Sequence, residues 1–179
     1  TGTLNIDTLD ICVQNKVKPY IRTASSSSGA LNIPNGSGGA AGGSVKKLIL
    51  RDMDVLMDSD LSTAAMAGAD VGPGSGWTIG EVSVVNNQYR VNGSAQLTNG
   101  VNISATLTAC GLVSLIDSSH DGSRGSLVTN GRSAVVSAIN CHNKRAVATE
   151  GLLKSSVSST MRAVNCTAFP GTPLFLLQG

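Results

Sequence analysis

The sequence contains few aromatic and few charged residues. Aromatic residues make up 3% of the 179 residues and charged residues 13%, whereas an average globular domain carries roughly 25% charged residues. Small and β-branched residues such as glycine, serine, alanine, valine and threonine take their place. This mixture favours closely stacked strands with tight turns over helices. Regularly spaced Val, Ile and Leu residues argue against disorder of the whole chain, so we expect one all-β domain with a real core.

Other absences argue against whole classes of function. The net charge is +2, and the basic pairs Lys46-Lys47 and Lys144-Arg145 stand alone, so we expect no nucleic-acid binding. No apolar window approaches the ~20 residues that a membrane helix needs, so we expect no membrane insertion. Residues 1–7 have neither the basic start nor the apolar stretch of a signal peptide, although a processed secretory precursor stays open.

The cysteines lack the spacing of a metal site. There are four of them, at Cys12, Cys110, Cys141 and Cys166. No Cys-x-x-Cys pair occurs, and His120 and His142 belong to no ligand pair, so we expect no metal and no cofactor. Reduced structural thiols and two disulfides are the alternatives that remain, and we favour the thiols.

A short phrase occurs three times in the second half of the chain. Its copies are residues 96–100 (QLTNG), 127–131 (LVTNG) and 147–151 (VATEG). From the glycine of each copy, the next cysteine follows after ten, ten and fifteen residues. Fixed phrases with connections of unequal length are typical of a stacked repeat. This pattern predicts that Cys110, Cys141 and Cys166 lie one above another as a buried ladder.

A second alignment supports a stack of strands. Residues 111–117 (GLVSLID) resemble residues 134–140 (AVVSAIN), twenty-three positions later. The apolar residues 134–136 are adjacent, which predicts burial on both faces of their strand. Burial of the outer face is expected if that face packs against another subunit.

The chain divides into three parts by composition. Residues 1–22 form an N-terminal strand or attachment arm, residues 23–44 a Gly/Ser-rich linker or loop, and residues 45–179 a repetitive β body. The body closes on residues 169–179, an abruptly apolar tail that we expect to cap the last layer or to lock subunits together.

Three local predictions concern the body. Alternation over residues 48–58 predicts a single strand that places Asp52 and Asp54 on one face. Residues 61–69, rich in Ala and Met, predict one short helix that caps the stack. Further strands are expected at residues 81–85, 89–91, 94–98, 102–109, 112–117, 126–129, 134–140, 146–149, 155–157 and 161–166.

The Thr-Asn-Gly turns, the Asn-Cys steps and a repeat of roughly twenty to thirty residues give residues 77–168 the style of a right-handed parallel β-helix. The chain resembles the trimeric tailspikes and tail fibres of bacteriophages, whose bodies use such rungs. The resemblance implies a homotrimer in the virion that joins other virion proteins through the N-terminal arm and contacts a bacterial surface glycan. Synthesis in a reducing host cytoplasm would fit unpaired cysteines.

Asp52 and Asp54 are the best candidates for catalysis. A β-helix that cleaves polysaccharide needs two carboxylates in a groove, about 5–10 Å apart. The same pair, followed by Asp58 and Asp60, could instead coordinate Ca²⁺. The simpler interpretation, which we favour, is that these acids decorate the wet face of a strand and discourage edge pairing.

Two other features have structural interpretations that we prefer. Residues 118–121 (SSHD) contain the side chains of a hydrolase triad, but adjacent residues of a strand point apart, so we expect a polar turn. Trp77 could stack on a sugar, but the simpler interpretation is that it anchors a loop on the core. Residues 36–39 resemble a phosphate-binding loop only superficially.

The sequence therefore predicts a non-enzymatic structural component of a virion, which is a trimeric phage fibre, a spike or a capsid-decorating appendage that contacts the host cell surface. The alternatives are a capsular-polysaccharide depolymerase that uses Asp52 and Asp54, and a secreted, extracellular bacterial adhesin that binds glycans without cleaving them.

Overall fold

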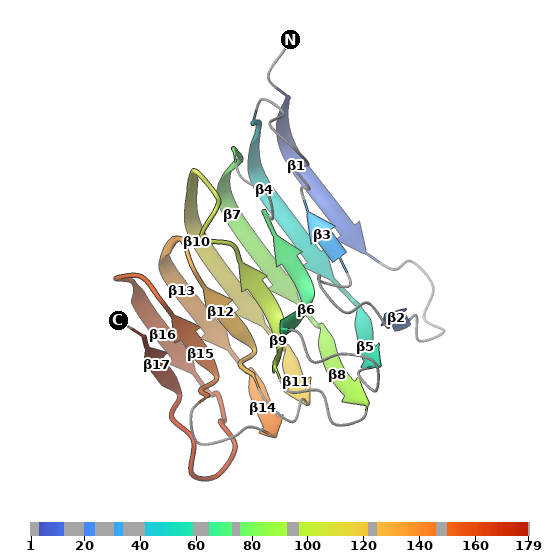
Figure 1. Ribbon diagram of the computed structural model, residues 1–179, viewed down its shortest axis with the longest axis vertical. Coiled ribbons are helices and arrows are strands. Elements are labelled where there is room, and N and C mark those ends of the chain that lie inside the picture. The colour runs from blue at the N-terminus through green and yellow to red at the C-terminus, as the bar shows by residue number, and fades with distance from the viewer. Residues whose placement is uncertain are drawn as a thin grey trace.

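The computed structural model describes residues 4–12, 20–23, 31–33, 42–58, 65–72, 76–92, 97–121, 125–145 and 150–178 (Figure 1). Every regular element in these ranges is a β-strand, which confirms the all-β prediction. In chain order the strands are β1 (Asn5–Cys12), β2 (Tyr20–Thr23), β3 (Leu31–Ile33), β4 (Ser44–Arg51), β5 (Asp54–Asp58), β6 (Ala65–Val71), β7 (Thr78–Val85), β8 (Gln88–Asn92), β9 (Leu97–Ile103), β10 (Ala109–Ile116), β11 (Ser119–Asp121), β12 (Val128–Asn130), β13 (Ser133–Ile139), β14 (His142–Arg145), β15 (Leu153–Ser155), β16 (Thr160–Val164) and β17 (Phe175–Leu177).

Successive strands enter three parallel sheets in rotation. Sheet A has the order β1-β4-β7-β10-β13-β16, sheet B the order β2-β5-β8-β11-β14, and sheet C the order β3-β6-β9-β12-β15-β17. From β1 to β15, each strand therefore pairs with the strand three places later. We call three successive strands, one from each sheet, a circuit. The sixth circuit has β16 and β17, and between them Thr167 forms an isolated bridge to His142.

The register stacks equivalent residues into columns. The central inward column of sheet A contains Leu9, Leu48, Val82, Val113, Val136 and Met161. Its four middle members are fully buried, whereas Leu9 and Met161, at the two ends, are only partly buried. A β-branched or leucine side chain fills such a position well. The pleat places it between the side chains at equivalent positions of the two neighbouring strands, at the usual strand spacing of about 4.7–4.9 Å.

Side chains from all three sheets meet in one apolar core. Leu50 comes from sheet A, Val55 and Tyr89 from sheet B, and Val71 and Val101 from sheet C, and all five are fully buried. Figure 1 shows the strands of sheet A following one another from β1 to β16. None of the described residues forms a helix that could cross a membrane.

Three local predictions are wrong. The helix expected over residues 61–69 is not formed, because residues 65–69 belong to strand β6; residues 61–64 lie outside the described ranges. The single strand expected over residues 48–58 is two strands, β4 and β5, in different sheets. The strand expected over residues 102–109 is interrupted by turns at residues 105–108, between β9 and β10. In the second and third cases a corner between two sheets replaces a continuous strand.

The N-terminal strands share the sheets of the body. β1 pairs with β4 from Asn5 to Cys12, and β3 pairs with β6 although it lies within the range expected to be a linker. The tail contributes β17, which pairs with β15 along the edge of sheet C. The functional division into an attachment arm (residues 1–22), a linker (23–44) and a body (45–179) stays a prediction.

An ion pair is buried at the corner between sheets B and C. Lys154 Nζ lies 3.1 Å from both Oε1 and Oε2 of Glu150. The Oγ of Ser126 donates a third hydrogen bond to Oε2 at 3.3 Å. Glu150 is 4% exposed, so its charge depends on Lys154 for compensation.

We expect Lys154→Met to lower the free energy of unfolding by about 3–5 kcal/mol, because it leaves the buried Glu150 carboxylate without its counter-charge. The double variant Glu150→Gln/Lys154→Met should recover most of that loss. Urea unfolding followed by circular dichroism measures both. The matched control is Lys47→Met, which breaks a half-exposed pair with Glu81 and should cost no more than about 1 kcal/mol. Equal effects of the two lysine substitutions would contradict the assignment.

Candidate functional site

The corner between sheets A and B has the same backbone geometry in each of the last five circuits. One residue at each corner adopts a left-handed conformation, with φ between 51° and 58°, and these residues are Asp52, Asn86, Asp117, Asn140 and Asn165. Asn and Asp tolerate this conformation better than other residues with a side chain. The corner thus explains why short polar residues recur where each strand of sheet A ends.

The side chains of these corner residues bond to one another outside the stack. Asn86 Nδ2 donates to Asp52 Oδ1 at 2.9 Å, and Asn140 Nδ2 donates to Asp117 Oδ1 at 3.0 Å. Asn165 Nδ2 continues the series to Asn140 Oδ1 at 2.7 Å. We call this series the corner ladder. Asp52 belongs to it, so its carboxylate already has a structural partner.

The residue after each corner residue points inward and forms an inner column. Its members are Met53, Asn87, Ser118, Cys141 and Cys166. The backbone N–H of Met53 donates to Asn87 Oδ1 at 2.9 Å, and that of Asn87 to Ser118 Oγ at 3.2 Å. The N–H of Cys141 donates to Cys166 Sγ at 3.4 Å. Side chains of one circuit therefore accept the corner N–H groups of the circuit before.

The predicted cysteine ladder is correct for two of its three members. Cys141 and Cys166 occupy successive positions of the inner column, but Cys110 lies at the start of β10, in register with Ile79 and Ser133. All four cysteines are free thiols, as favoured. Burial raises the pKa of the Cys110 and Cys141 thiols to about 11.

The three-fold phrase does not mark equivalent positions. Val101 pairs with Val128, so Gly100 lies opposite Leu127, and Gly131 follows β12 at the next corner. The alignment of residues 111–117 with 134–140 is confirmed, because Leu112 pairs with Val135 and Ile116 with Ile139. A run of seven matched residues thus identified the register where a five-residue phrase did not.

Asp52 and Asp54 do not share a strand face, contrary to the prediction. Asp52 lies in the corner at φ 58°, and Asp54 begins β5 in the next sheet. Asp54 is buried, and both of its oxygens accept from Arg90, at 2.8 Å from Nε and 2.7 Å from Nη2. Such a bidentate pair fixes a carboxylate in a structural role. Asp58 lies in β5, and Asp60 lies outside the described residues.

The hydrolase-like residues 118–121 point in different directions. The expected polar turn is strand β11, which begins at Ser119. Ser118 Oγ donates to the carbonyl of Ile116 at 2.9 Å, while His120 is buried with Nδ1 3.2 Å from Asn143 Oδ1. Asp121 is half-buried, and alternation along the strand directs its side chain away from the face that His120 occupies. Ser118 and His120 are both buried, whereas Asp121 lies on the other face of the strand, so the three side chains do not share one face as a triad requires.

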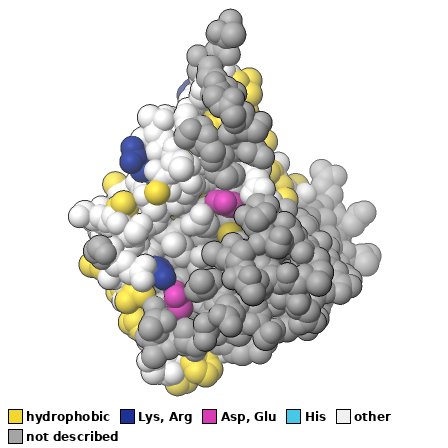
Figure 2. All heavy atoms as spheres, in the orientation of Figure 1, with side chains coloured by type: hydrophobic (Ala, Val, Ile, Leu, Met, Phe, Trp, Pro, Cys, Tyr) yellow, Lys and Arg dark blue, Asp and Glu magenta, His cyan; other side chains and the backbone are white. Residues whose placement is uncertain are grey.

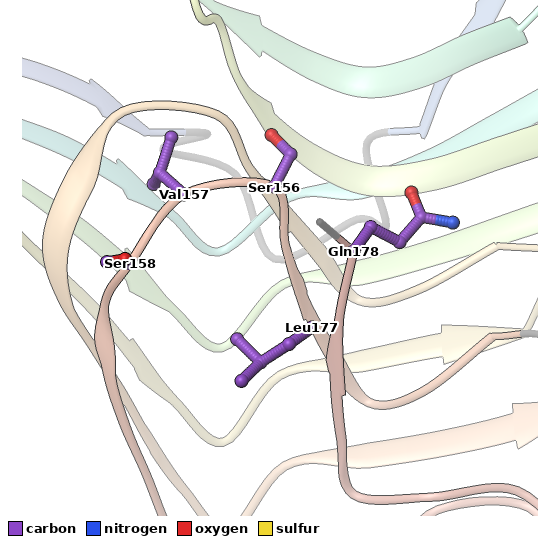
Figure 3. A pocket seen from close by; sticks show the side chains of 5 residues that line it. All are labelled: Ser156, Val157, Ser158, Leu177 and Gln178. Carbon is purple, nitrogen blue, oxygen red and sulfur yellow. The ribbon is translucent and has the colours of Figure 1, made fainter.

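Trp77 and residues 36–39 are the remaining candidates from the sequence. Trp77 is partly buried against the core. Residues 36–39 lie outside the described residues. No group of three or more His, Cys, Asp or Glu side chains that could hold a metal occurs among the residues that the structure describes. A shallow open depression at the C-terminal end is lined by Ser156, Val157, Ser158, Leu177 and Gln178 (Figure 3), none of which titrates near neutral pH.

An apolar stripe that was not among the predictions from the sequence lies on the outer face of sheet A. We call it the outer stripe; its members, in register, are Val85, Ile116, Ile139 and Val164. Ile139 is 40% exposed and Val164 60%. Strands β10 and β13 contain no charged residue, whereas Lys46–Asp7, Lys47–Glu81 and Arg51–Asp10 ion pairs cover the N-terminal half of the face. The signal in the sequence that could have identified this stripe is the spacing of the aliphatic residues that face outward.

Apolar exposure increases towards the C-terminal strands. The other strongly exposed large apolar residues after residue 139 are Phe169, Leu174, Phe175 and Leu177. Figure 2 shows hydrophobic side chains gathered along the edge of the molecule where the last strands lie in Figure 1. Of the seven exposed large apolar residues in the described part of the chain, all but Leu4 lie at or after Ile139.

Comparisons with family models, with curated proteins and with solved structures find no match for this chain.

The corner ladder gives a matched test of its own backbone geometry. We expect Asn140→Ala to be less stable than Asn140→Gly by about 1 kcal/mol, because both variants lose the ladder amide but only alanine meets the left-handed strain. Urea unfolding of the two variants measures the difference. Ordinary right-handed backbone at this corner would reverse the order, since glycine elsewhere is the less stable residue.

Asp70 predicts a pH dependence. Its carboxylate accepts from Asn102 Nδ2 at 2.9 Å, but burial raises its pKa overall. A raised pKa in the folded state means that the stabilising contribution is complete below the unfolded pKa and is lost as the pH rises through the folded pKa. We expect Asp70→Asn to raise the thermal midpoint at pH 7 and to leave it unchanged near pH 3. Calorimetry at both pH values tests this, and a lower midpoint at pH 7 would contradict it.

Proposed function

We propose that the chain is a right-handed parallel β-helix. Three features support the assignment: the rotation of strands through three parallel sheets, the columns of identical register, and the corner ladder that repeats in successive circuits. The helix is assigned a right-handed sense because crossover connections between parallel strands are almost always right-handed. Apolar residues of all three sheets would then fill the interior of the helix.

We further propose that this β-helix is a structural shaft that associates with copies of itself, as a component of a fibre or spike. The outer stripe is the observation that carries the proposal. Its side chains repeat at the strand spacing of about 4.8 Å, and a surface with the same period fits them best. Another copy of the chain provides such a surface. The central strands β10 and β13 contain no charge that such a contact would bury, and the exposed Arg162 of β16 lies beside the C-terminal end of the stripe.

The shape of the face also favours close packing. A column of small residues, Ser83, Ser114 and Ser137, separates the outer stripe from the apolar pair Leu112 and Val135. Small side chains beside larger apolar ones allow a second sheet to pack closely against this face, as in face-to-face sheet packing. Exposed apolar residues in this arrangement are typical of a surface that is covered in the assembly.

A homotrimer in a phage virion, in contact with other virion proteins and with a bacterial surface glycan, is the specific form of this proposal. The resemblance to tailspikes and tail fibres supports it, as does the structural use of the polar residues in the described corners. Location in the virion, after synthesis in the host cytoplasm, belongs to the same proposal.

Two alternatives have less support. Polysaccharide cleavage by Asp52 and Asp54 would need both carboxylates free to act in a groove, whereas Asn86 bonds the first and Arg90 the second. A secreted adhesin that binds glycans stays a prediction, and no aromatic platform in the described residues favours it over a shaft.

Sedimentation of the wild-type chain at micromolar concentration tests self-association. We expect an oligomer, and about a threefold fall in mass for Ile139→Lys/Val164→Lys, because two charges per copy would be buried in the contact. The matched control is Gln88→Lys, an exposed position on the outer face of sheet B, which should keep the oligomer. Thermal unfolding should show all three proteins folded. A wild-type monomer, or an oligomer unaffected by the double substitution, would overturn the proposal.

A further inference from the structure

Two thiols lie in directly successive circuits of the inner column. Ile139 pairs with Val164 and His142 with Thr167, so the residues between them bring Cys141 opposite Cys166. The backbone N–H of Cys141 donates to Cys166 Sγ at 3.4 Å. No structural role described above requires both members of the column to be cysteine, because Ser118 fills the same position one circuit earlier.

The backbones on both sides of the two cysteines are held at the spacing that a disulfide needs. Asn140 N donates to the carbonyl of Val164 at 3.0 Å, and Thr167 N donates to the carbonyl of Cys141 at 3.0 Å. Strands bonded in this way lie about 4.8 Å apart, within the roughly 4.4–6.8 Å between Cα atoms that disulfides span. The spacing of the two strands therefore matches the Cα separation that a disulfide needs.

A rotation of one side chain is needed instead. Cys141 Sγ and Cys166 Sγ each donate to the carbonyl two residues earlier, both at 3.2 Å, so the thiols point the same way. The side chains next to them in the core are small. The neighbouring inward column has Leu115 in the fourth circuit but the smaller Ala138 and Ala163 in the fifth and sixth.

We propose that Cys141 and Cys166 are a reversible dithiol–disulfide pair that a small-molecule disulfide such as oxidised glutathione converts to an intramolecular cross-link. Cys166, the more exposed thiol, loses its proton and attacks one sulfur of the reagent, which releases one reduced glutathione and leaves a mixed disulfide. Cys141 then loses its proton and attacks Cys166 Sγ, which releases the second reduced glutathione. Two thiols are oxidised and one disulfide of the reagent is reduced.

The other two cysteines lack such a partner. Cys110 lies between Ile79 and Ser133 in its column, and Cys12 pairs in register with Arg51. The second step at Cys141 is controlled by its buried thiol, whose pKa is raised to about 11. Its rate should therefore increase with pH up to that value, because only the thiolate attacks.

The cross-link would fasten the sixth circuit to the fifth. In the described residues, the sixth circuit has a neighbour on one side only, and its inward residues Met161, Cys166 and Ala168 are only partly buried. A disulfide across this step closes the loop that contains β14, β15 and β16 and restricts the unfolded chain. The chain would thus gain stability on passing from a reducing to an oxidising environment, whether or not it associates with other copies.

The test uses the folded wild-type chain with oxidised glutathione at pH 8.5. We expect the number of titratable thiols in denaturant to fall from four to two, a non-reduced digest to contain one peptide pair joined through Cys141 and Cys166, and the thermal midpoint to rise. Dithiothreitol should reverse all three changes. Four remaining thiols, a stable glutathione adduct at Cys166 without the cross-link, or a cross-link between chains would each overturn the proposal.

Serine variants provide the matched controls. Serine already occurs in both columns, as Ser118 and Ser133, so we expect Cys141→Ser and Cys110→Ser to fold. Cys141→Ser should keep glutathione on Cys166 and show no rise in thermal midpoint, whereas Cys110→Ser should form the cross-link as the wild type does. A cross-link that persists in Cys141→Ser, or one that is lost in Cys110→Ser, would contradict the assignment. Because every readout comes from one chain, the result is independent of self-association.

Discussion

Backbone hydrogen bonding between strands of successive circuits, three places apart in the chain up to β15, is the constraint on which this structure depends. It fixes the register of all three sheets, and it places like positions of successive circuits directly above one another. A column such as Leu48, Val82, Val113 and Val136 is buried along its whole length because each member covers the next. The same constraint leaves the first and last members only partly covered, which concentrates apolar exposure at the ends.

The corners between sheets A and B show how a repeated backbone geometry selects residues. A left-handed residue is needed to turn the chain from one sheet into the next, and Asn or Asp supplies it at every corner described. Their side chains then bond outside the stack, while the following residues bond inside it. Asp52 and Ser118, which belong to residue types that catalysis often uses, therefore form hydrogen bonds that join successive circuits. This use supports the proposal of a structural shaft over that of an enzyme.

The outer face of sheet A contains the surface with the clearest potential for association. Charge pairs cover its N-terminal half, β10 and β13 present apolar or small side chains, and β16 presents Val164 beside the exposed Arg162. A parallel sheet of this kind is normally covered on both faces. Within the described residues nothing covers Ile139 and Val164, so association with a second copy would complete the pattern that the sheet itself begins.

Some of this arrangement was determined by the sequence alone. The scarcity of aromatic and charged residues indicated an all-β fold, and the match of residues 111–117 with 134–140 gave the true register, because seven residues that occupy equivalent positions face equivalent surroundings. The burial on both faces that residues 134–136 predicted is not seen within the chain, where Ala134 is exposed and Val135 only partly buried. Only the tertiary structure decided where the chain turns. Alternation continues through Asp52 as if β4 and β5 were one strand, and a local pattern does not show that a left-handed residue moves the chain into another sheet. The position of Cys110 was decided in the same way, since its column depends on strands that are distant in sequence, whereas the short phrase that precedes it falls at different points of successive circuits.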